Sequence, residues 1–138
     1  IKADVVGQDE TEMGLRAILN FGHTIGHALE AISRYGKYLH GEAISLGQVA
    51  AAMISSRVTG LPLADVDRIR MLFKRAGLPV SVRLTKAQRK QLFEAMRLDK
   101  KVSAGEIKFV LARRIGKVEY GIQVPAVEIE AVLDAIAA

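Results

Sequence analysis

The fold of this chain is decided by the stretch from residue 12 to residue 30, which reads EMGLRAILNFGHTIGHALE. Polar residues recur in it at intervals of 4, 4, 3 and 4, and they are Glu12, Arg16, Asn20, His23 and His27. On a continuous α-helix these five side chains fall within about 80° of one another, with apolar residues around them. The pattern therefore predicts one helix that begins after a cap at Asp9 or Thr11 and ends near Ile32.

Three glycines, Gly14, Gly22 and Gly26, lie inside this predicted helix. Each costs roughly 1 kcal/mol relative to alanine in a helix interior, so three of them need a reason. Close approach of another backbone or of a ligand is the usual one. A solvated helix face is the competing interpretation. Such faces are usually built from Lys and Glu, whereas this one carries Asn, two His and glycine neighbours.

The rest of the chain predicts a mainly α fold with one small β-hairpin. Residues 1–8 are expected to be extended or loop-like. Gly60 and Gly77 are typical helix stops, and Gly116 is typical of a tight turn. We expect further helices over residues 41–59, 64–76 and 86–98 and after Pro125, and hairpin strands over residues 106–112 and 117–124.

The three histidines of the chain, His23, His27 and His40, fall within 18 residues. Two histidines at positions i and i+4 of a helix can reach one metal ion, although most such pairs bind nothing. His40 follows a loop short enough to fold back on the first helix. Three histidines suit a complete zinc site, or two ligands and one proton carrier, and the residues leave both alternatives open. The chain has no Cys, which excludes thiolate ligands and disulfides.

Length and composition favour one domain spanning residues 1–138, since half of the 138 residues are hydrophobic. The net charge is +5, but Lys and Arg are scattered without interleaved aromatics. This distribution argues against nucleic acid as a partner and favours a few cations facing an anionic substrate. No apolar run approaches the roughly 20 residues of a membrane span. We expect a cytoplasmic location and, because the chain begins with Ile1, a cut from a longer protein.

Several blocks together resemble one enzyme family, the 3-dehydroquinate synthases. Residues 14–30 closely resemble its central signature, and residues 39–43 (LHGEA) resemble its next block. Residues 75–79 (RAGLP) and 99–101 (DKK) with Gly105 match later blocks, and Lys2 with residues 5–6 (VV) also fits. The agreement in order and spacing covers essentially the whole chain and is more specific than any single block.

The resemblance implies the C-terminal, metal-holding domain of a two-domain enzyme. Its N-terminal α/β domain would bind NAD, and this chain has no glycine-rich nucleotide fingerprint. The family converts 3-deoxy-D-arabino-heptulosonate 7-phosphate to 3-dehydroquinate and phosphate, a lyase reaction of the shikimate pathway. It uses NAD⁺ and a divalent metal, zinc or cobalt. The expected partners are the phosphorylated sugar-acid substrate, the missing NAD-binding domain and a second copy in a homodimer, and we expect the isolated fragment to be inactive.

Site residues follow from the resemblance by motif position. The metal ligands would be His23 and His40, with a glutamate of the N-terminal domain as the third. His27 would carry a proton, and Glu12 would be a second acid–base residue. The substrate carboxylate, hydroxyls or phosphate would be bound by Lys2, Arg16, Asn20 and one of Lys100 and Lys101. Glu30 could orient an imidazole, but a plain solvated glutamate is the favoured interpretation.

Three alternatives remain at this point. A related NAD- and metal-dependent sugar-phosphate cyclase would share most of these residues. A metal-dependent alcohol dehydrogenase also pairs a helical metal domain with a nucleotide domain, but the Arg16 face and residues 100–101 argue against it, because a simple alcohol has no phosphate to hold. The third alternative is a non-enzymatic helical module with a closed, structural metal site. That module predicts no response to NAD⁺.

Overall fold

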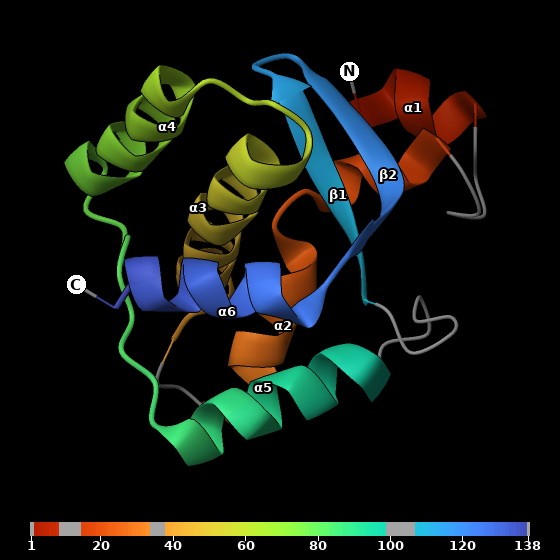
Figure 1. Ribbon diagram of the computed structural model, residues 1–138. Coiled ribbons are helices and arrows are strands. Elements are labelled where there is room, and N and C mark those ends of the chain that lie inside the picture. Colours follow the sequence, from red (N-terminus) through yellow and green to blue (C-terminus); the bar gives the residue numbers. More distant parts are fainter. Residues whose placement is uncertain (1, 9–14, 34–37, 99–106, 138) are drawn as a thin grey trace.

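The computed structural model describes residues 2–8, 15–33, 38–98 and 107–137. Six α-helices, one 3₁₀ helix and one β-hairpin make up this part of the chain, which confirms the mainly helical fold (Figure 1). The elements are α1 (Lys2–Gln8), η1 (Leu15–Asn20), α2 (His23–Ile32), α3 (His40–Val58), α4 (Leu63–Arg75), α5 (Lys86–Leu98), β1 (Ile107–Arg114), β2 (Lys117–Val124) and α6 (Ala126–Ala135). No helix in these ranges is long and apolar enough to cross a bilayer.

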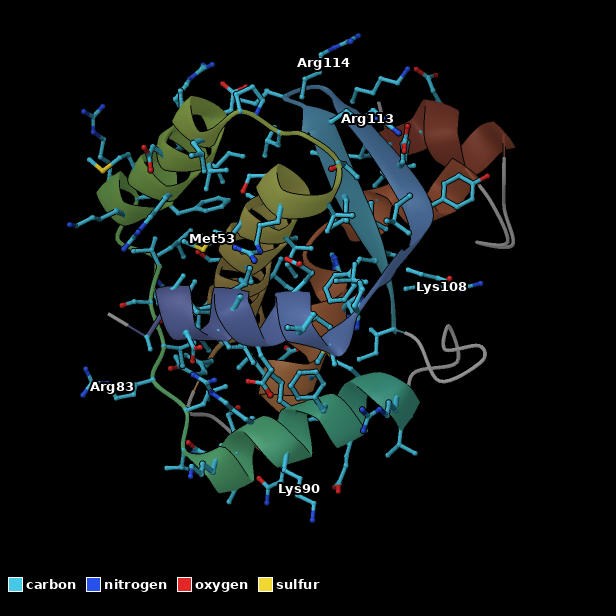
Figure 2. All side chains as sticks on the ribbon, viewed as in Figure 1. Met53, Arg83, Lys90, Lys108, Arg113 and Arg114 are labelled. Atoms are coloured by element: carbon cyan, nitrogen blue, oxygen red, sulfur yellow. The ribbon has the colours of Figure 1, made fainter. Side chains whose placement is uncertain are left out.

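Helix α3 is the central element of the fold. It contacts α2, α4, α6 and β1, which surround it in Figure 1. All four residues from Val49 to Ala52 are buried, because neighbours cover α3 on every side in its middle. Met53 packs against both the main core and a smaller core cluster, which consists of Ala52, Leu61, Val66 and Ala112. Its side chain points inward in Figure 2, so α3 joins the two clusters.

Two predictions at the N-terminal end were wrong. Residues 2–8 form the helix α1, not an extended segment, and α1 contacts η1. The predicted long helix is broken, because η1 ends at Asn20 and α2 begins only at His23. Gly22, between them, has φ +83°, a left-handed conformation that interrupts an α-helix. The polar face proposed from Glu12 to His27 is therefore not carried by one continuous helix.

The other predicted boundaries agree with the structure within one or two residues. Gly60 and Gly77 have φ of +84° and +79°, and each follows the end of a helix. Thr85 caps α5 reciprocally with Gln88: the Gln88 amide donates to Thr85 Oγ1 at 3.1 Å, and the Thr85 amide donates to Gln88 Oε1 at 2.9 Å. Pro125 immediately precedes α6, where its missing N–H is harmless. Local turn chemistry accounts for these ends.

The hairpin is fastened to α3 through one residue of β1. The amide of Ala112 donates to Ser55 Oγ at 2.9 Å, and Thr59 Oγ1 donates to the Ala112 carbonyl at 2.6 Å. Ser55 Oγ itself donates to the Ala51 carbonyl at 2.6 Å. A further contact joins Thr24 Oγ1 of α2 to the Lys108 carbonyl at 3.5 Å. The hairpin thus packs against both helices that carry histidines.

Charged side chains lie around the outside of this core. Arg83, Lys90, Lys108 and Arg114 point away from the molecule in Figure 2, whereas Arg113 pairs with Glu119 across the hairpin. On α5, Arg89 pairs with α6 through Glu130 at 2.9 Å and Asp134 at 2.7 Å, which ties these two helices together. The basic groups labelled in the figure are therefore dispersed and form no single stripe.

Candidate functional site

Helices α2 and α3 form an antiparallel pair whose backbones touch. A Cβ built on Gly47 would lie 2.0 Å from the carbonyl oxygen of Gly22 and 2.7 Å from the amide nitrogen of Gly26. A Cβ on Gly26 would meet the Ala43 carbonyl oxygen at 3.2 Å. Such short separations are possible only without side chains, so glycine is required at these positions because the two backbones approach each other closely. Gly22 and Gly26 were predicted for that role, whereas Gly47 was missed although it stands inside a predicted helix.

This close contact brings the three histidine rings together across the helix pair. The ring centroids of His23 and His27 are 4.9 Å apart, and His40 lies 6.1 Å from His23 and 6.0 Å from His27. His23 and His27 sit one turn apart on α2, and His40 is the first residue of α3. The convergence predicted from the sequence is present in the structure.

Glu30, one turn beyond His27 on α2, belongs to the same group. Its Oε1 lies 2.8 Å from His40 Nδ1. Ligand atoms of His27, Glu30 and His40 all lie within 4.8 Å of one another, close enough to hold one metal ion. This grouping shares His40 with the pair predicted from the sequence but contains His27 in place of His23. The geometry alone therefore supports two ligand sets.

His23 is the most enclosed of the three rings. Its Nδ1 is buried and has no hydrogen-bond partner among the described residues. Burial lowers the pKa of His23 below its ordinary value, His27 acts in the same direction, and the carbonyls of Phe21 and Asn20 act against it. A lowered pKa favours the neutral ring, the form that binds a metal. A buried imidazole nitrogen without a partner also fits a metal ligand better than a structural histidine.

The site is open to solvent on its other side. His27 is exposed, and the His40 side chain is 63% exposed. A shallow cavity of about 260 Å³ lies nearby between α2 and α5, beside Leu29, Tyr38 and Gln88, but none of the three histidines lines it. The histidines therefore present themselves on a surface, as expected of a site that another structural unit completes.

The first helical turn of α3 holds His40 in place. The side chain of Glu42 accepts a hydrogen bond from the Leu39 amide at 2.8 Å, which caps the N-terminus of α3. An acidic residue in the first turn is also favoured by the helix dipole. The sequence block LHGEA thus combines a histidine with the residue that caps its helix.

The remaining predicted residues are only partly located. Asn20 ends η1 and is half-buried, and Lys2 is exposed on α1. Arg16 lies in η1, but its side chain is outside the described part of the structure. Glu12, Lys100 and Lys101 lie outside the described residues altogether. The roles predicted for these six residues stay predictions.

Known proteins resemble this chain along nearly its whole length. A family model for the 3-dehydroquinate synthase C-terminal region matches residues 1–102. The 3-dehydroquinate synthase of Bordetella pertussis is 51% identical over 117 residues, 85% of this chain and 32% of that protein. The enzyme of the same name from Nitrosomonas europaea is 49% identical over 125 residues, 91% of this chain and 33% of that protein. The chain thus spans about a third of the length of these curated relatives.

Solved structures of another enzyme share the fold. A 2-deoxy-scyllo-inosose synthase complexed with carbaglucose-6-phosphate, NAD⁺ and Co²⁺ is 27% identical, with a TM-score of 0.84 over 96% of this chain and 38% of that one. A second structure of 2-deoxy-scyllo-inosose synthase is 26% identical, with a TM-score of 0.77 over 97% of this chain and 36% of that one. The likeness extends over the helices and the hairpin together.

Proposed function

Because the chain belongs to the family of 3-dehydroquinate synthase C-terminal domains, we propose that it is the histidine-bearing part of a two-domain 3-dehydroquinate synthase. The reaction would convert 3-deoxy-D-arabino-heptulosonate 7-phosphate to 3-dehydroquinate and phosphate. This chain has no glycine-rich nucleotide-binding loop, so NAD⁺ would be bound by an N-terminal domain. The observation that carries the proposal is the convergence of the His23, His27 and His40 rings across the α2–α3 pair.

The histidines suit a divalent metal. We assign His23 and His40 as its ligands in this chain, with the remaining protein ligand supplied by the N-terminal domain. The Nδ1 of His23 is buried without a hydrogen-bond partner among the described residues, and this burial together with the lowered pKa of the ring supports that assignment. When bound, such a metal would lower the pKa of a substrate hydroxyl and orient it for oxidation by NAD⁺. The Co²⁺ and NAD⁺ in the similar 2-deoxy-scyllo-inosose synthase structure support this cofactor pair.

His27 is proposed as the proton carrier. It is exposed, so a substrate can reach it, and histidine is the side chain most often used to carry protons in enzyme active sites. Glu12 would be a second acid–base group. Anionic and hydroxyl groups of the substrate would be bound by Lys2, Arg16, Asn20 and one of Lys100 and Lys101. Arginine suits a carboxylate through two parallel hydrogen bonds, and lysine suits a phosphate as a compact charge.

A related sugar-phosphate cyclase is the second candidate. The likeness to 2-deoxy-scyllo-inosose synthase favours it, since the same fold there accompanies a sugar-phosphate analogue, NAD⁺ and Co²⁺. The higher identity to 3-dehydroquinate synthases favours the first candidate. The two candidate enzymes differ in substrate, so parallel assays with the phosphorylated substrate of each enzyme decide between them.

The test uses a chimera of the Bordetella pertussis relative. In this chimera, the present chain replaces the matching third of the relative and is joined to the relative's N-terminal two thirds. We expect phosphate release from 3-deoxy-D-arabino-heptulosonate 7-phosphate that depends on NAD⁺ and on added zinc or cobalt. The same chimera with His23→Ala is the matched control and should be inactive. A folded chimera that binds NAD⁺ but releases no phosphate, beside an active parent enzyme, would contradict the proposal.

A further inference from the structure

The hydrogen bond between Glu30 and His40 has a defined donor and a defined acceptor. An ionised carboxylate offers acceptors only, so a 2.8 Å contact from Glu30 Oε1 to His40 Nδ1 requires the hydrogen to sit on Nδ1. A neutral imidazole has one such hydrogen, and Nε2 then keeps its free lone pair. Unrestrained histidine prefers the opposite tautomer, with the hydrogen on Nε2. The contact therefore selects the less favoured form of the ring.

From this contact we propose that Glu30 is a positioning residue that holds His40 in the Nδ1–H tautomer and presents Nε2 to the metal. The inference rests on the proposed function for the metal, but the tautomer itself can be observed without one. Metal-bound histidines commonly donate their second ring nitrogen to a carboxylate in this way, which orients the ring and raises its basicity. Glu30 then supports His40 and is not itself a ligand.

Geometry supports positioning over a merely solvated glutamate. The Glu30 side chain is only 32% exposed, compared with 63% for His40, so the carboxylate is more enclosed than the ring that it contacts. Glu30 and His27 lie one turn apart on α2, and His40 begins α3. The bond crosses the open end of the helix pair, where His40 has little other cover. Without Glu30, the described residues offer the ring no other hydrogen-bond partner.

The test uses the metal-free 138-residue chain with ¹⁵N-labelled histidine. Long-range ¹H–¹⁵N correlations report which ring nitrogen carries the hydrogen, at a pH high enough for all three rings to be neutral. Three histidines give three patterns, and the loss of one in His40→Gln identifies His40. We expect His40 to be the Nδ1–H tautomer in the parent and to shift to the Nε2–H tautomer in Glu30→Ala.

Two variants separate positioning from charge and from general disturbance. Glu30→Gln offers the ring both a carbonyl acceptor and an N–H donor on the same stem, so it can pair with either tautomer and should give a mixture of the Nδ1–H and Nε2–H forms. Glu94→Ala removes an exposed glutamate from α5 that has no ion pair with a histidine among the described residues, and it should leave all three rings as in the parent. An unchanged His40 tautomer in Glu30→Ala, or an Nε2–H tautomer in the parent, would overturn the proposal.

A titration with Co²⁺ in the active chimera adds a second readout. Loss of an outer hydrogen-bond partner typically weakens metal binding ~10–100-fold, so Glu30→Ala should fall in that range and Glu30→Gln should retain most of the affinity. Equal losses in Glu30→Ala and Glu30→Gln would overturn positioning and identify Glu30 as a direct ligand. Absence of Co²⁺ binding in the parent, with a tautomer that still depends on Glu30, would contradict the proposed function while supporting the role of Glu30.

Discussion

His23 and His27 are neighbours on one helix, yet their surroundings differ in the way that their two proposed roles require. His23 has a buried ring nitrogen and a pKa lowered chiefly by burial, whereas His27 is exposed. A buried neutral ring suits a permanent ligand, and an exposed ring suits transient proton exchange. The grouping of His27 with Glu30 and His40 within 4.8 Å is the competing assignment.

Single substitutions in the active chimera distinguish the two assignments. His23→Ala should lose both bound metal and activity. His27→Ala should keep the metal and slow the reaction by ~10²–10⁴-fold, the range for loss of a general acid or base. Metal content measured on the purified variants, beside steady-state rates, provides the check. Normal metal content in His23→Ala together with metal loss in His27→Ala would assign the ligands to the second grouping.

At the scale of elements, the α2–α3 contact makes Gly47 the most sensitive position of the site. In Gly47→Ala the new methyl group would collide with backbone atoms of Gly22 and Gly26, which cannot rotate away. We expect the variant to lose at least about 3 kcal/mol of unfolding free energy, or to displace α3 from α2.

Gly41→Ala is the matched control on the same helix, because nothing lies within 4 Å of its Cβ position. It should be neutral or up to about 1 kcal/mol more stable, since alanine favours a helix. Denaturant unfolding of both variants supplies the comparison. Similar stabilities would show that the helices separate easily, which is incompatible with the backbone contact described above.

The attachment of β1 to α3 leads to another prediction. Ser55→Ala leaves the Ala112 amide buried without its partner, which should cost about 1–3 kcal/mol of unfolding free energy. Ser56→Ala removes only a bond within α3, to the Met53 carbonyl, and should change stability by about 0.5 kcal/mol or less. Thermal melts of the two variants should therefore differ clearly, and equal melting temperatures would mean that the hairpin does not depend on Ser55.

Sequence patterns predicted most elements because their ends depend on local chemistry. Glycines with positive φ, a Thr cap and Pro125 mark helix boundaries whatever the tertiary structure is. The break at Gly22 could not be predicted, because a glycine inside an apolar periodic stretch is compatible with a helix until another backbone, here Gly47, packs against it. The prediction for residues 2–8 (KADVVGQ) was wrong for a related reason. Two Val and a Gly weaken the local helix preference, and the contact of α1 with η1 cannot be predicted from the sequence.

The site was predictable to a similar degree. The i, i+4 spacing predicted that His23 and His27 lie close together, and the short loop before His40 predicted that His40 joins them. The hydrogen bond from His40 to Glu30 was not favoured from the sequence, because a glutamate at a helix end is usually solvated. Its partner lies 10 residues away on another helix, so only the packing of α2 against α3 reveals it.

At the scale of the molecule, His27 and His40 are exposed, and none of the three histidines lines the cavity between α2 and α5. The chain also spans about a third of the length of its curated relatives. The proposed active site would need a second surface to exclude water and to supply NAD⁺ and further ligands. The isolated chain should therefore fold but lack catalytic activity.

We expect the 138-residue chain alone to fold, to bind zinc weakly, and to release no phosphate from the substrate. Two histidines provide fewer bonds than a three-ligand site, and water must fill the other positions. Circular dichroism, zinc titration and a phosphate assay check the three parts. Phosphate release by the chain alone, at a rate near that of the full-length relatives, would show that the second domain is dispensable.

Glycine contacts between α2 and α3 also bear on how this part of the molecule opens to solvent. Most helix pairs separate gradually, since their side chains can repack while the backbones move apart. Here the two backbones meet directly at Gly22, Gly26 and Gly47, so even a small separation removes the contact and opens a gap that no side chain can fill. The amides in the middle of both helices should therefore exchange their hydrogens together, in a single cooperative unit whose protection approaches that of global unfolding.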